Sequence, residues 1–474
     1  MKKDGLGDRL YRQKALNLVS QYENMLKNNE NHFFGPESFE RIIEYYEEHL
    51  ELNKALGVVE YALTQYPYSA VFLIRKASLI FESGLPNKAL DLLEQAQILA
   101  PSEQEIFTLK AEVYTKLERY DEALEILEYA LIFADKEERG NIYITISDIF
   151  DSENKEVEAF NYIKKALKLN PQNEAALNKI DYYVESLENY DESIELHQWI
   201  IDESPYCYLA WYNLGNAYFG LSLFEKAIEA YDFVTVINDK FDLAFRDSGE
   251  AYYEIGRYAE AKEQYTEALN LGEADEDLLY NIGLCYYQME QFNNATIYFE
   301  EALKLNEMHQ DSHYQLGEYY VKIERWQSAL YHYEKSLNIS PDDLMSLAAV
   351  SEIYILLGKG EKAIEINRAA LERNFNKKEY WLLMAKIYFT LQEYEQAEEV
   401  SAMATEELED SELDVINYFL AAALMAQGKK ADAMLHFSQA LAQNYNEHEH
   451  FFDLVPQHKT NLELIVLLEQ YAKD

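Results

Sequence analysis

Residues 210–221 read AWYNLGNAYFGL, and parts of this stretch recur along the chain at a fixed interval of 34 residues. Self-similarity at this period is the signature of a repeat array, in which each unit is one supersecondary motif. Its first glycine, Gly215, is followed at this interval by Gly249, Gly283 and Gly317. Its second tyrosine, Tyr218, is followed by Tyr252, Tyr286, Tyr320, Tyr354 and Tyr388. We therefore interpret the stretch first as part of a repeat, and only then as a possible site.

The period extends over most of the chain. Small slips near residues 138–139 and 412–413 bring the outer repeats into phase, which gives starts at 36, 70, 104, 140, 174, 208, 242, 276, 310, 344, 378 and 414. The twentieth residue of each repeat is alanine in eleven repeats and serine in one. This predicts twelve repeats over 36–447, preceded by an N-terminal segment, 1–35, and followed by a C-terminal capping segment, 448–474.

Each repeat has two stretches of helical period. Trp211, Leu214 and Tyr218 have the i, i+3, i+7 spacing of one helix face, and a second periodic stretch follows after a short polar break. Small residues at positions 8, 20 and 27 allow close approach of helices, and large residues at positions 4, 11 and 24 fill the gaps. A single helix–turn–helix unit cannot bury its apolar face alone, so the units must stack.

The pattern Trp211-x-x-Leu214-Gly215-x-x-Tyr218, followed by Ala227 and Tyr231, resembles the tetratricopeptide repeat (TPR). The whole chain also resembles long bacterial proteins made only of such repeats. The resemblance implies an all-α, right-handed superhelical α-solenoid of about twelve units with terminal capping helices. It further implies that the first helices line a concave face and that this face binds partner proteins.

Charge and composition limit the range of partners. The chain has 86 acidic and 41 basic residues, a net charge of −45, which disfavours nucleic acid and membrane surfaces as partners. A cationic partner would fit this charge, and so would a merely soluble, self-repelling surface. No signal peptide and no apolar run of membrane-spanning length stands out, so we expect a cytoplasmic protein.

No motif for catalysis is found, and we expect neither an enzyme nor a bound cofactor or metal. Cys207 and Cys285 are too few for a disulfide framework and are best read as structural thiols. The trio from His448 to His450 has ligand-type side chains but no second cluster, so a solvated loop is the better interpretation.

The candidate partner-binding groove consists of the positions expected to face the concave side in repeats 208–341. Aromatic side chains with few rotatable bonds and amides with paired donors and acceptors suit an extended peptide. The same tyrosines could instead fill space between neighbouring repeats, and both interpretations stay open. The groove residues are Tyr212, Asn213, Asn216, Phe219, Arg246, Asp247, Glu250, Tyr253, Asp277, Tyr280, Asn281, Tyr287, Tyr314, Gln315 and Glu318.

The resemblance also bears on what the groove would bind. In some long arrays of the family an asparagine at position 6 hydrogen-bonds the peptide backbone, and Asn213 and Asn281 keep it. Other members grip acidic chain ends with a clamp of lysine, arginine and asparagine. Here Asp247 and Asp277 stand at clamp positions, so we expect a neutral to basic, partly aromatic segment as partner.

The predicted terminal helices are residues 10–28 and 461–471. The second one is apolar nearly all round, from Leu462 to Leu468. It either packs on two sides, against the array and a second surface such as another copy of the chain, or forms a buried hairpin with residues 450–455.

The functional expectation is a non-catalytic scaffold or adaptor that binds protein segments in its concave groove. Two alternatives remain open at this point. The array could be a regulatory or docking subunit of a separately encoded enzyme, or a self-assembling structural protein that associates through residues 461–474.

Overall fold

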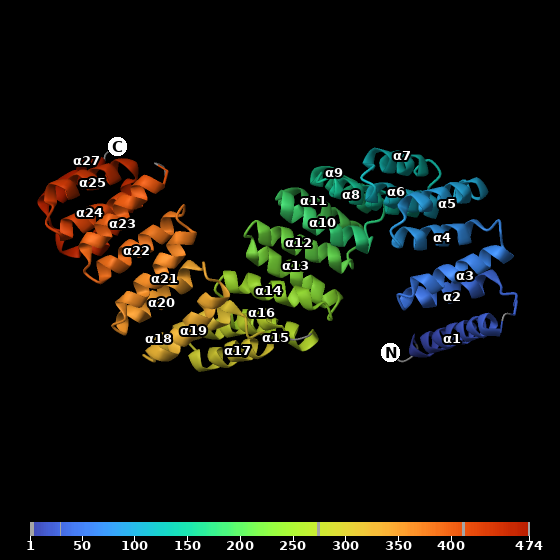
Figure 1. Cartoon of the computed structure of the whole chain (residues 1–474), viewed down its shortest axis with the longest axis horizontal. Coiled ribbons are helices and arrows are strands. Elements are labelled where there is room, and N and C mark those ends of the chain that lie inside the picture. The colour runs from blue at the N-terminus through green and yellow to red at the C-terminus, as the bar shows by residue number, and fades with distance from the viewer. Residues whose placement is uncertain (1–3, 29, 273–274, 410–412, 473–474) are drawn as a thin grey trace. The chain divides into compact units, whose positions relative to one another are not determined.

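A computed structural model describes residues 4–28, 30–272, 275–409 and 413–472, and the regular structure of these residues is helical (Figure 1). The chain divides into two compact units, Met1–Ala244 and Phe245–Asp474, with the division inside helix α14. The all-α repeat architecture expected from the sequence is confirmed. No helix within the described ranges is both long enough and apolar enough to cross a membrane.

The first unit is a stack of helices coloured blue to green in Figure 1. Its helices are α1 (Asp4–Asn28), α2 (Pro36–Glu48), α3 (Leu52–Gln65), α4 (Ala70–Glu82), α5 (Pro86–Leu99), α6 (Gln104–Lys116), α7 (Tyr120–Ala130), α8 (Lys136–Ser152), α9 (Glu156–Leu169), α10 (Glu174–Leu187), α11 (Tyr190–Glu203), α12 (Tyr208–Gly220) and α13 (Phe224–Ile237).

The second unit continues the pattern and ends in short helices. Its helices are α14 (Asp242–Glu254), α15 (Tyr258–Leu271), α16 (Glu276–Gln288), α17 (Phe292–Leu305), α18 (Gln310–Lys322), α19 (Trp326–Ile339), α20 (Leu344–Leu356), α21 (Gly360–Arg373), α22 (Lys378–Thr390), α23 (Tyr394–Glu407), α24 (Leu413–Ala426), α25 (Lys430–Gln443), α26 (Glu449–Leu454) and α27 (Leu462–Tyr471).

Helices pack in sequence order within each unit. Most even-numbered helices pack against the odd-numbered helix that follows, as α8 does against α9 and α16 against α17. Some even-numbered helices also touch each other, as α10 touches α12 and α20 touches α22. We call the side formed by the even-numbered helices α2–α24 the first-helix face. The side formed by the odd-numbered helices α3–α25 is the second-helix face.

Glycine on the even-numbered helices makes the close packing possible. A Cβ atom placed on Gly215 would lie 2.4 Å from a ring carbon of Tyr231, and one on Gly283 would lie 2.6 Å from a ring carbon of Phe299. Both distances are far below van der Waals contact. The aromatic ring of the second helix thus occupies the space that a side chain on the first helix would need.

A left-handed residue ends the turn within each helix pair. Among the residues that the structure describes, twelve have a positive φ angle, and four of these are glycine. They are Leu50, Gly84, Glu118, Asn154, Glu188, Ser222, Gly256, Glu290, Glu324, Gly358, Gln392 and Gly428. A left-handed residue after a helix satisfies the last carbonyls of that helix and reverses the chain, which is why the turns can be so short.

The C-terminal residues cover the last helix pair. Phe451, Phe452 and Val455 are buried in one apolar cluster with α24 and α25, and Leu464 of α27 belongs to the same cluster. The other side of α27 is exposed at Leu462, which is 77% accessible. Helix α27 therefore has one buried and one exposed apolar side.

Candidate functional site: the first-helix face

In the first unit, the predicted groove residue Asn213 lies inside the stack. It is 2% exposed, and its side-chain amide donates a hydrogen bond of 2.8 Å to the carbonyl oxygen of Leu177 on α10. The same nitrogen lies 3.3 Å from Nε2 of the buried His197 on α11. Asn213 thus joins three helices of the stack and presents no polar atom to a ligand.

Asn216, one turn further along α12, is also held by its neighbours. Its amide nitrogen donates to Asp181 of α10 at 2.9 Å, and its amide oxygen accepts from the hydroxyl of Tyr231 at 2.8 Å. Burial raises the pKa of Asp181, and the hydrogen bond from Asn216 partly offsets this rise. The amide stabilises a half-buried carboxylate between successive helix pairs.

The two aromatic groove residues of the first unit contact other rings. Tyr212 packs edge-on against Phe241 with ring centres 5.0 Å apart, and Phe219 packs edge-on against Phe224 at 5.2 Å. All four predicted residues of this unit therefore take part in packing between or within helix pairs. Their observed contacts are those expected of residues that fill space between neighbouring helices.

In the second unit, Tyr280 is the centre of a polar cluster. Its ring centre lies 5.2 Å from that of His309, whose Nε2 lies 3.0 Å from the carboxylate of Asp277. Burial raises the pKa of Tyr280, and a side-chain hydrogen bond from Gln315 of α18 lowers it in part. The structure therefore brings the predicted residues Asp277, Tyr280 and Gln315 together across α16 and α18.

Asn281 differs from Asn213. It is half-buried and makes no side-chain hydrogen bond with any residue that the structure describes. An amide in this state can still give two donors and an acceptor to a ligand. Asn281 is therefore the position-6 asparagine that remains available on the first-helix face.

The remaining groove residues of the second unit have varied surroundings. Arg246 forms an ion pair with Asp275, the hydroxyl of Tyr253 accepts from Gln288 at 3.1 Å, and Glu318 accepts from the hydroxyl of Tyr333. Asp247 is half-buried and Glu250 is exposed. Tyr287 has the ammonium group of Lys322 over its ring at 4.6 Å, and Tyr314 packs on Tyr333 with ring centres 5.4 Å apart.

The sequence reasoning missed an apolar pocket further along the same face. It has a volume of about 290 Å³ and lies between α20 and α22. Glu352 and Lys386 stand at its rim without an ion-pair partner among the described residues, and Leu356 is 64% exposed. The lining residues are Ala348, Ser351, Glu352, Ile355, Leu356, Leu383, Lys386, Ile387 and Thr390.

A signal for this pocket is present in the sequence. Residues 344–357 read LMSLAAVSEIYILL, in which only Glu352 is charged. A helix that is apolar all round has more apolar surface than one contact with a neighbour can bury. The stretch has one aromatic and no amide side chain, so it lacks the residue types that we expected in the groove.

The first unit has a pocket of about 510 Å³ on its first-helix face. Glu112 of α6 and Asp148 of α8 contribute acidic side chains to it, and Lys179 of α10 pairs with Asp148. Burial raises the pKa of Glu112. Acidic side chains therefore line first-helix pockets in both units.

The first-helix face closes at its C-terminal end. Val415 and Phe419 of α24 are buried in a cluster with Leu382 and Ala385 of α22, and Leu454 of α26 packs against this cluster. Helix α26 thus covers the part of α24 that would otherwise extend the face. The accessible part of the face in this unit ends near α22.

The two cysteines lie in apolar surroundings. Burial raises the pKa of the Cys285 thiol to about 12 and also raises that of Cys207. Both thiols stay protonated at neutral pH and are poor nucleophiles.

Models of known protein families match several segments of the chain. Models described as Tetratricopeptide repeat match residues 208–241, 276–309 and 140–173, and one described as TPR repeat matches 249–290. A model of subunit 3 of the anaphase-promoting complex, or cyclosome, matches 48–130 and 325–404. These matches fall on the helix pairs described above.

The chain is a tetratricopeptide-repeat protein. Tetratricopeptide repeats form protein–protein interaction scaffolds, and the family is generally non-catalytic. The search of curated proteins gives no match for this tetratricopeptide-repeat protein.

Solved structures of other repeat proteins are similar to parts or most of the chain. YrrB, a TPR protein with an unusual peptide-binding site, is 22% identical and matches 39% of this chain and 95% of its own, with a TM-score of 0.32. MamA is 23% identical and matches 34% and 94%, with a TM-score of 0.32. The Cut9–Hcn1 hetero-tetramer of the anaphase-promoting complex is 13% identical and matches 90% and 99%, with a TM-score of 0.38.

Proposed function

We propose that this tetratricopeptide-repeat protein is a non-catalytic scaffold that binds extended, neutral to basic segments of partner proteins on its first-helix face. In this proposal residues 36–447 are twelve repeats, 1–35 lead into them, and 448–474 cover the end. The observation that carries the proposal is the apolar pocket between α20 and α22, which lies on the same face as Asn281 and the Tyr280 cluster.

The spacing of these features suits an extended peptide. Helices in contact lie on the order of 10 Å apart, so the step from α16 to α22 spans roughly 30 Å. An extended chain advances about 3.3 Å per residue, so about nine residues would cover this length. In this arrangement Asn281 bonds the peptide backbone and the pocket receives an apolar side chain.

The charge of the face favours a basic segment. Asp277, Glu250 and Glu352 are exposed acids on first helices of this unit. Exposed carboxylates attract basic peptides during association, and the attraction weakens as salt rises. Binding would therefore be fastest and tightest at low ionic strength.

Two matched nonapeptides test the proposal. They share two leucines and differ only in carrying three lysines or three glutamates, and isothermal titration measures their affinity in 20 mM and 300 mM NaCl. We expect the lysine peptide to bind at least tenfold more tightly at low salt, with the difference shrinking at high salt. Preference for the glutamate peptide would overturn the proposed charge specificity.

A pair of variants tests the position of the site. Leu356→Ser removes an exposed apolar side chain from the pocket and is expected to weaken the lysine peptide about tenfold. Ile297→Ser removes a half-exposed apolar side chain from the second-helix face of the same unit and serves as the matched control. Equal affinities for the two variants would place the peptide elsewhere.

We also propose self-association through α27, as a second and separate property. The support is the exposed apolar side of this helix, where Leu462 and Val466 lie on its solvent side. The mass of the native chain and of a Leu462→Ser/Val466→Ser variant in solution tests this. A native chain that is monomeric at 100 µM removes the proposal and leaves peptide binding untouched.

A further inference from the structure

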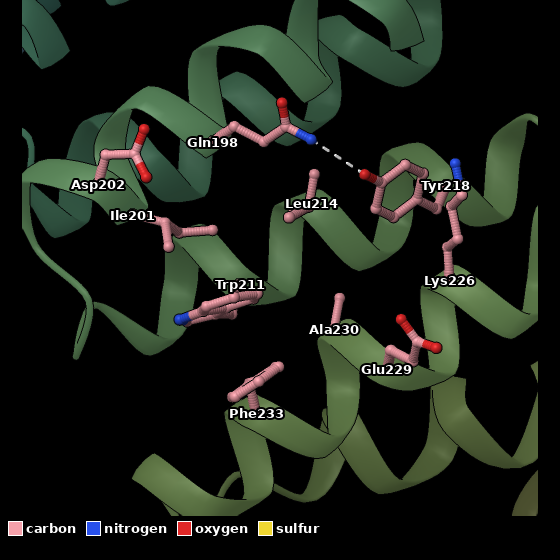
Figure 2. A pocket seen from close by; sticks show the side chains of 10 residues that line it. All are labelled: Gln198, Ile201, Asp202, Trp211, Leu214, Tyr218, Lys226, Glu229, Ala230 and Phe233. Carbon is pink, nitrogen blue, oxygen red and sulfur yellow. Dashed lines mark hydrogen bonds between the residues drawn. The ribbon is translucent and has the colours of Figure 1, made fainter.

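A second pocket lies in the first unit, away from the first-helix face. It opens between the second helices α11 and α13 and reaches α12 behind them, with a volume of about 430 Å³ (Figure 2). Leu214 and the small Ala230 form its buried inner side. The proposed peptide site uses none of these residues.

Ala230 is the reason that the pocket exists. At the same place in the other helix pairs the side chain is larger than that of alanine in every case. The equivalent residues are Val58, Leu92, Ile126, Tyr162, Leu196, Gln264, Tyr298, His332, Ile366, Val400 and His436. The small side chain of Ala230 is thus a departure from the repeat pattern, and the pocket lies beside it.

Aromatic rings form one side of the pocket. Trp211 and Phe233 stack with ring centres 4.3 Å apart and planes 21° apart. Both side chains are labelled in Figure 2. The indole N–H of Trp211 donates to the carbonyl oxygen of Pro205 at 2.9 Å, which fixes the orientation of the ring. Phe233 is 50% exposed, so part of the stacked pair is open to a ligand.

The opposite side is polar and closed by a hydrogen bond. The amide of Gln198 donates to the hydroxyl of Tyr218 at 3.1 Å (Figure 2). Lys226 has its ammonium group 5.3 Å from the centre of the Tyr218 ring, so this end already holds a cation. Like charges repel, so a second positive group would have to lie at the other end, beside Trp211 and Phe233.

Two carboxylates supply the charge for such a group. Asp202 on α11 and Glu229 on α13 are exposed lining residues, and neither has an ion-pair partner in the described part of the chain. Burial and the charge of Glu229 both raise the pKa of the neighbouring Asp232. The pocket thus has two exposed carboxylates against the one ammonium group of Lys226.

We propose that this pocket binds an arginine side chain of a basic segment of a partner protein. A guanidinium group is planar, stacks on aromatic rings and pairs with carboxylates at the same time. The stacked rings and the acids from two helices offer both kinds of contact. A lysine would gain the charge interaction but not the planar stacking, so arginine is preferred.

The site would act as a second anchor, independent of the first-helix face. A partner with two binding segments would gain from both because the second contact becomes intramolecular once the first has formed. This inference does not depend on the peptide site, and each can fail without the other.

Three peptides test the inference with the full-length chain. They are decapeptides of glycine and serine with one central arginine, lysine or citrulline, and isothermal titration at 150 mM NaCl measures their affinity. Citrulline keeps the shape of arginine and removes its charge. We expect arginine to bind about threefold more tightly than lysine and at least tenfold more tightly than citrulline.

Variants locate the binding. Ala230→Leu fills the pocket with a side chain that another helix pair carries at this place, and Asp202→Asn/Glu229→Gln removes the charge without changing shape. Each is expected to weaken the arginine peptide at least tenfold. Gln264→Leu, at the equivalent place in the second unit, is the control and should leave its affinity unchanged.

The melting curve of each variant shows whether it is folded. Unchanged affinity of a folded Ala230→Leu variant would overturn the inference. Equal binding of the arginine and citrulline peptides would overturn it as well, and so would full affinity of the charge variant. The last two readouts remain decisive even if Ala230→Leu does not fold.

Discussion

The ring of Tyr231 on α13 lies against the backbone of Gly215 on α12, so close that a Cβ on the glycine would be 2.4 Å from ring carbon Cε1. The tyrosine is buried and its hydroxyl is bonded to Asn216, so the ring has little freedom to move aside. This contact is one of those that hold the two helices of the pair together. It also explains why glycine recurs with a large aromatic residue sixteen positions later.

Gly215→Ala is expected to destabilise the first unit by about 1–3 kcal/mol because the added methyl group overpacks the helix interface. Chemical denaturation followed by circular dichroism measures the change. Gly57→Ala on α3 is the control, because nothing lies within 4 Å of its added Cβ. Alanine suits a helix better than glycine there, so a gain of about 0.5–1 kcal/mol is expected, and equal effects at both sites would contradict the packing account.

Leu50→Gly is expected to stabilise the first unit by about 1 kcal/mol. Leu50 has a φ of 58° and is 86% exposed, so it bears the strain of a left-handed residue without gaining contacts in return. Gly84 at the equivalent turn of the next helix pair has a φ of 77°. Gly84→Ala should therefore lower the stability of the unit by about 1 kcal/mol. Shifts in melting temperature of opposite sign are the expected result.

His197 should make the first unit less stable in mild acid. Its Nε2 faces the donating amide of Asn213 and its Nδ1 lies 2.8 Å from the carbonyl oxygen of Ser193, so the neutral ring fits. Burial lowers the pKa of His197 to about 4, from a value near 6.5 in the unfolded chain. Between these pH values the unfolded state binds a proton that the folded state excludes, so stability falls as pH decreases.

The full loss from this histidine is roughly 3 kcal/mol between pH 6.5 and 4. A His197→Leu variant should lose this contribution to the pH dependence, even if it is less stable at pH 7. Melting temperatures of both proteins from pH 7 to 4.5 measure it. A variant with the same slope as the native chain would show that another group is responsible.

Asn213 and Asn281 are expected to respond to alanine in opposite ways. Asn213→Ala removes the donor that faces the ring nitrogen of the buried His197 and a second hydrogen bond to the carbonyl of Leu177, which costs about 1–3 kcal/mol of stability. Asn281→Ala breaks no side-chain hydrogen bond among the described residues and should leave the melting temperature unchanged. It should instead weaken binding of the lysine nonapeptide several-fold, and a stable Asn281→Ala with native affinity would exclude this amide from the site.

Leu464 lies on the buried side of α27 and Leu462 on its exposed side, so substitutions of the two should differ in their effect on stability. Leu464 is fully buried against α25 and α26, so Leu464→Ala should cost about 2–5 kcal/mol in the second unit. Leu462, two residues earlier, is largely exposed, and Leu462→Ala should change stability by less than about 0.5 kcal/mol. Similar losses for both would mean that the exposed side of α27 is covered in solution.

The repeat fold could be predicted from particular residues. Gly215 and the aromatic residue at 231 recur in register because two helices of one pair must fit at that point, and alanine recurs wherever helix backbones come closest. Such contacts are local in sequence and repeat with the period, so they leave a pattern that a single chain displays. The all-α architecture followed from that pattern.

The candidate site was less predictable because it depends on which side of a helix a polar residue faces and on what its neighbours leave open. Asn213 and Asn281 occupy the same place in their repeats, yet one is bonded between helices and the other is available. The difference comes from His197 and Leu177 on adjacent helices. Only their three-dimensional contacts show it.

The sequence by itself determined the helix pairs, their order and their packing code, because those follow from contacts between residues a fixed number of positions apart. The tertiary structure decided where the surface is open: beside Ala230, between α20 and α22, and not on α24, where α26 lies. An opening depends on the sizes of side chains from three helices at once. The repeat pattern describes one helix pair at a time, so the combined fit of three helices is seen only in the packed structure.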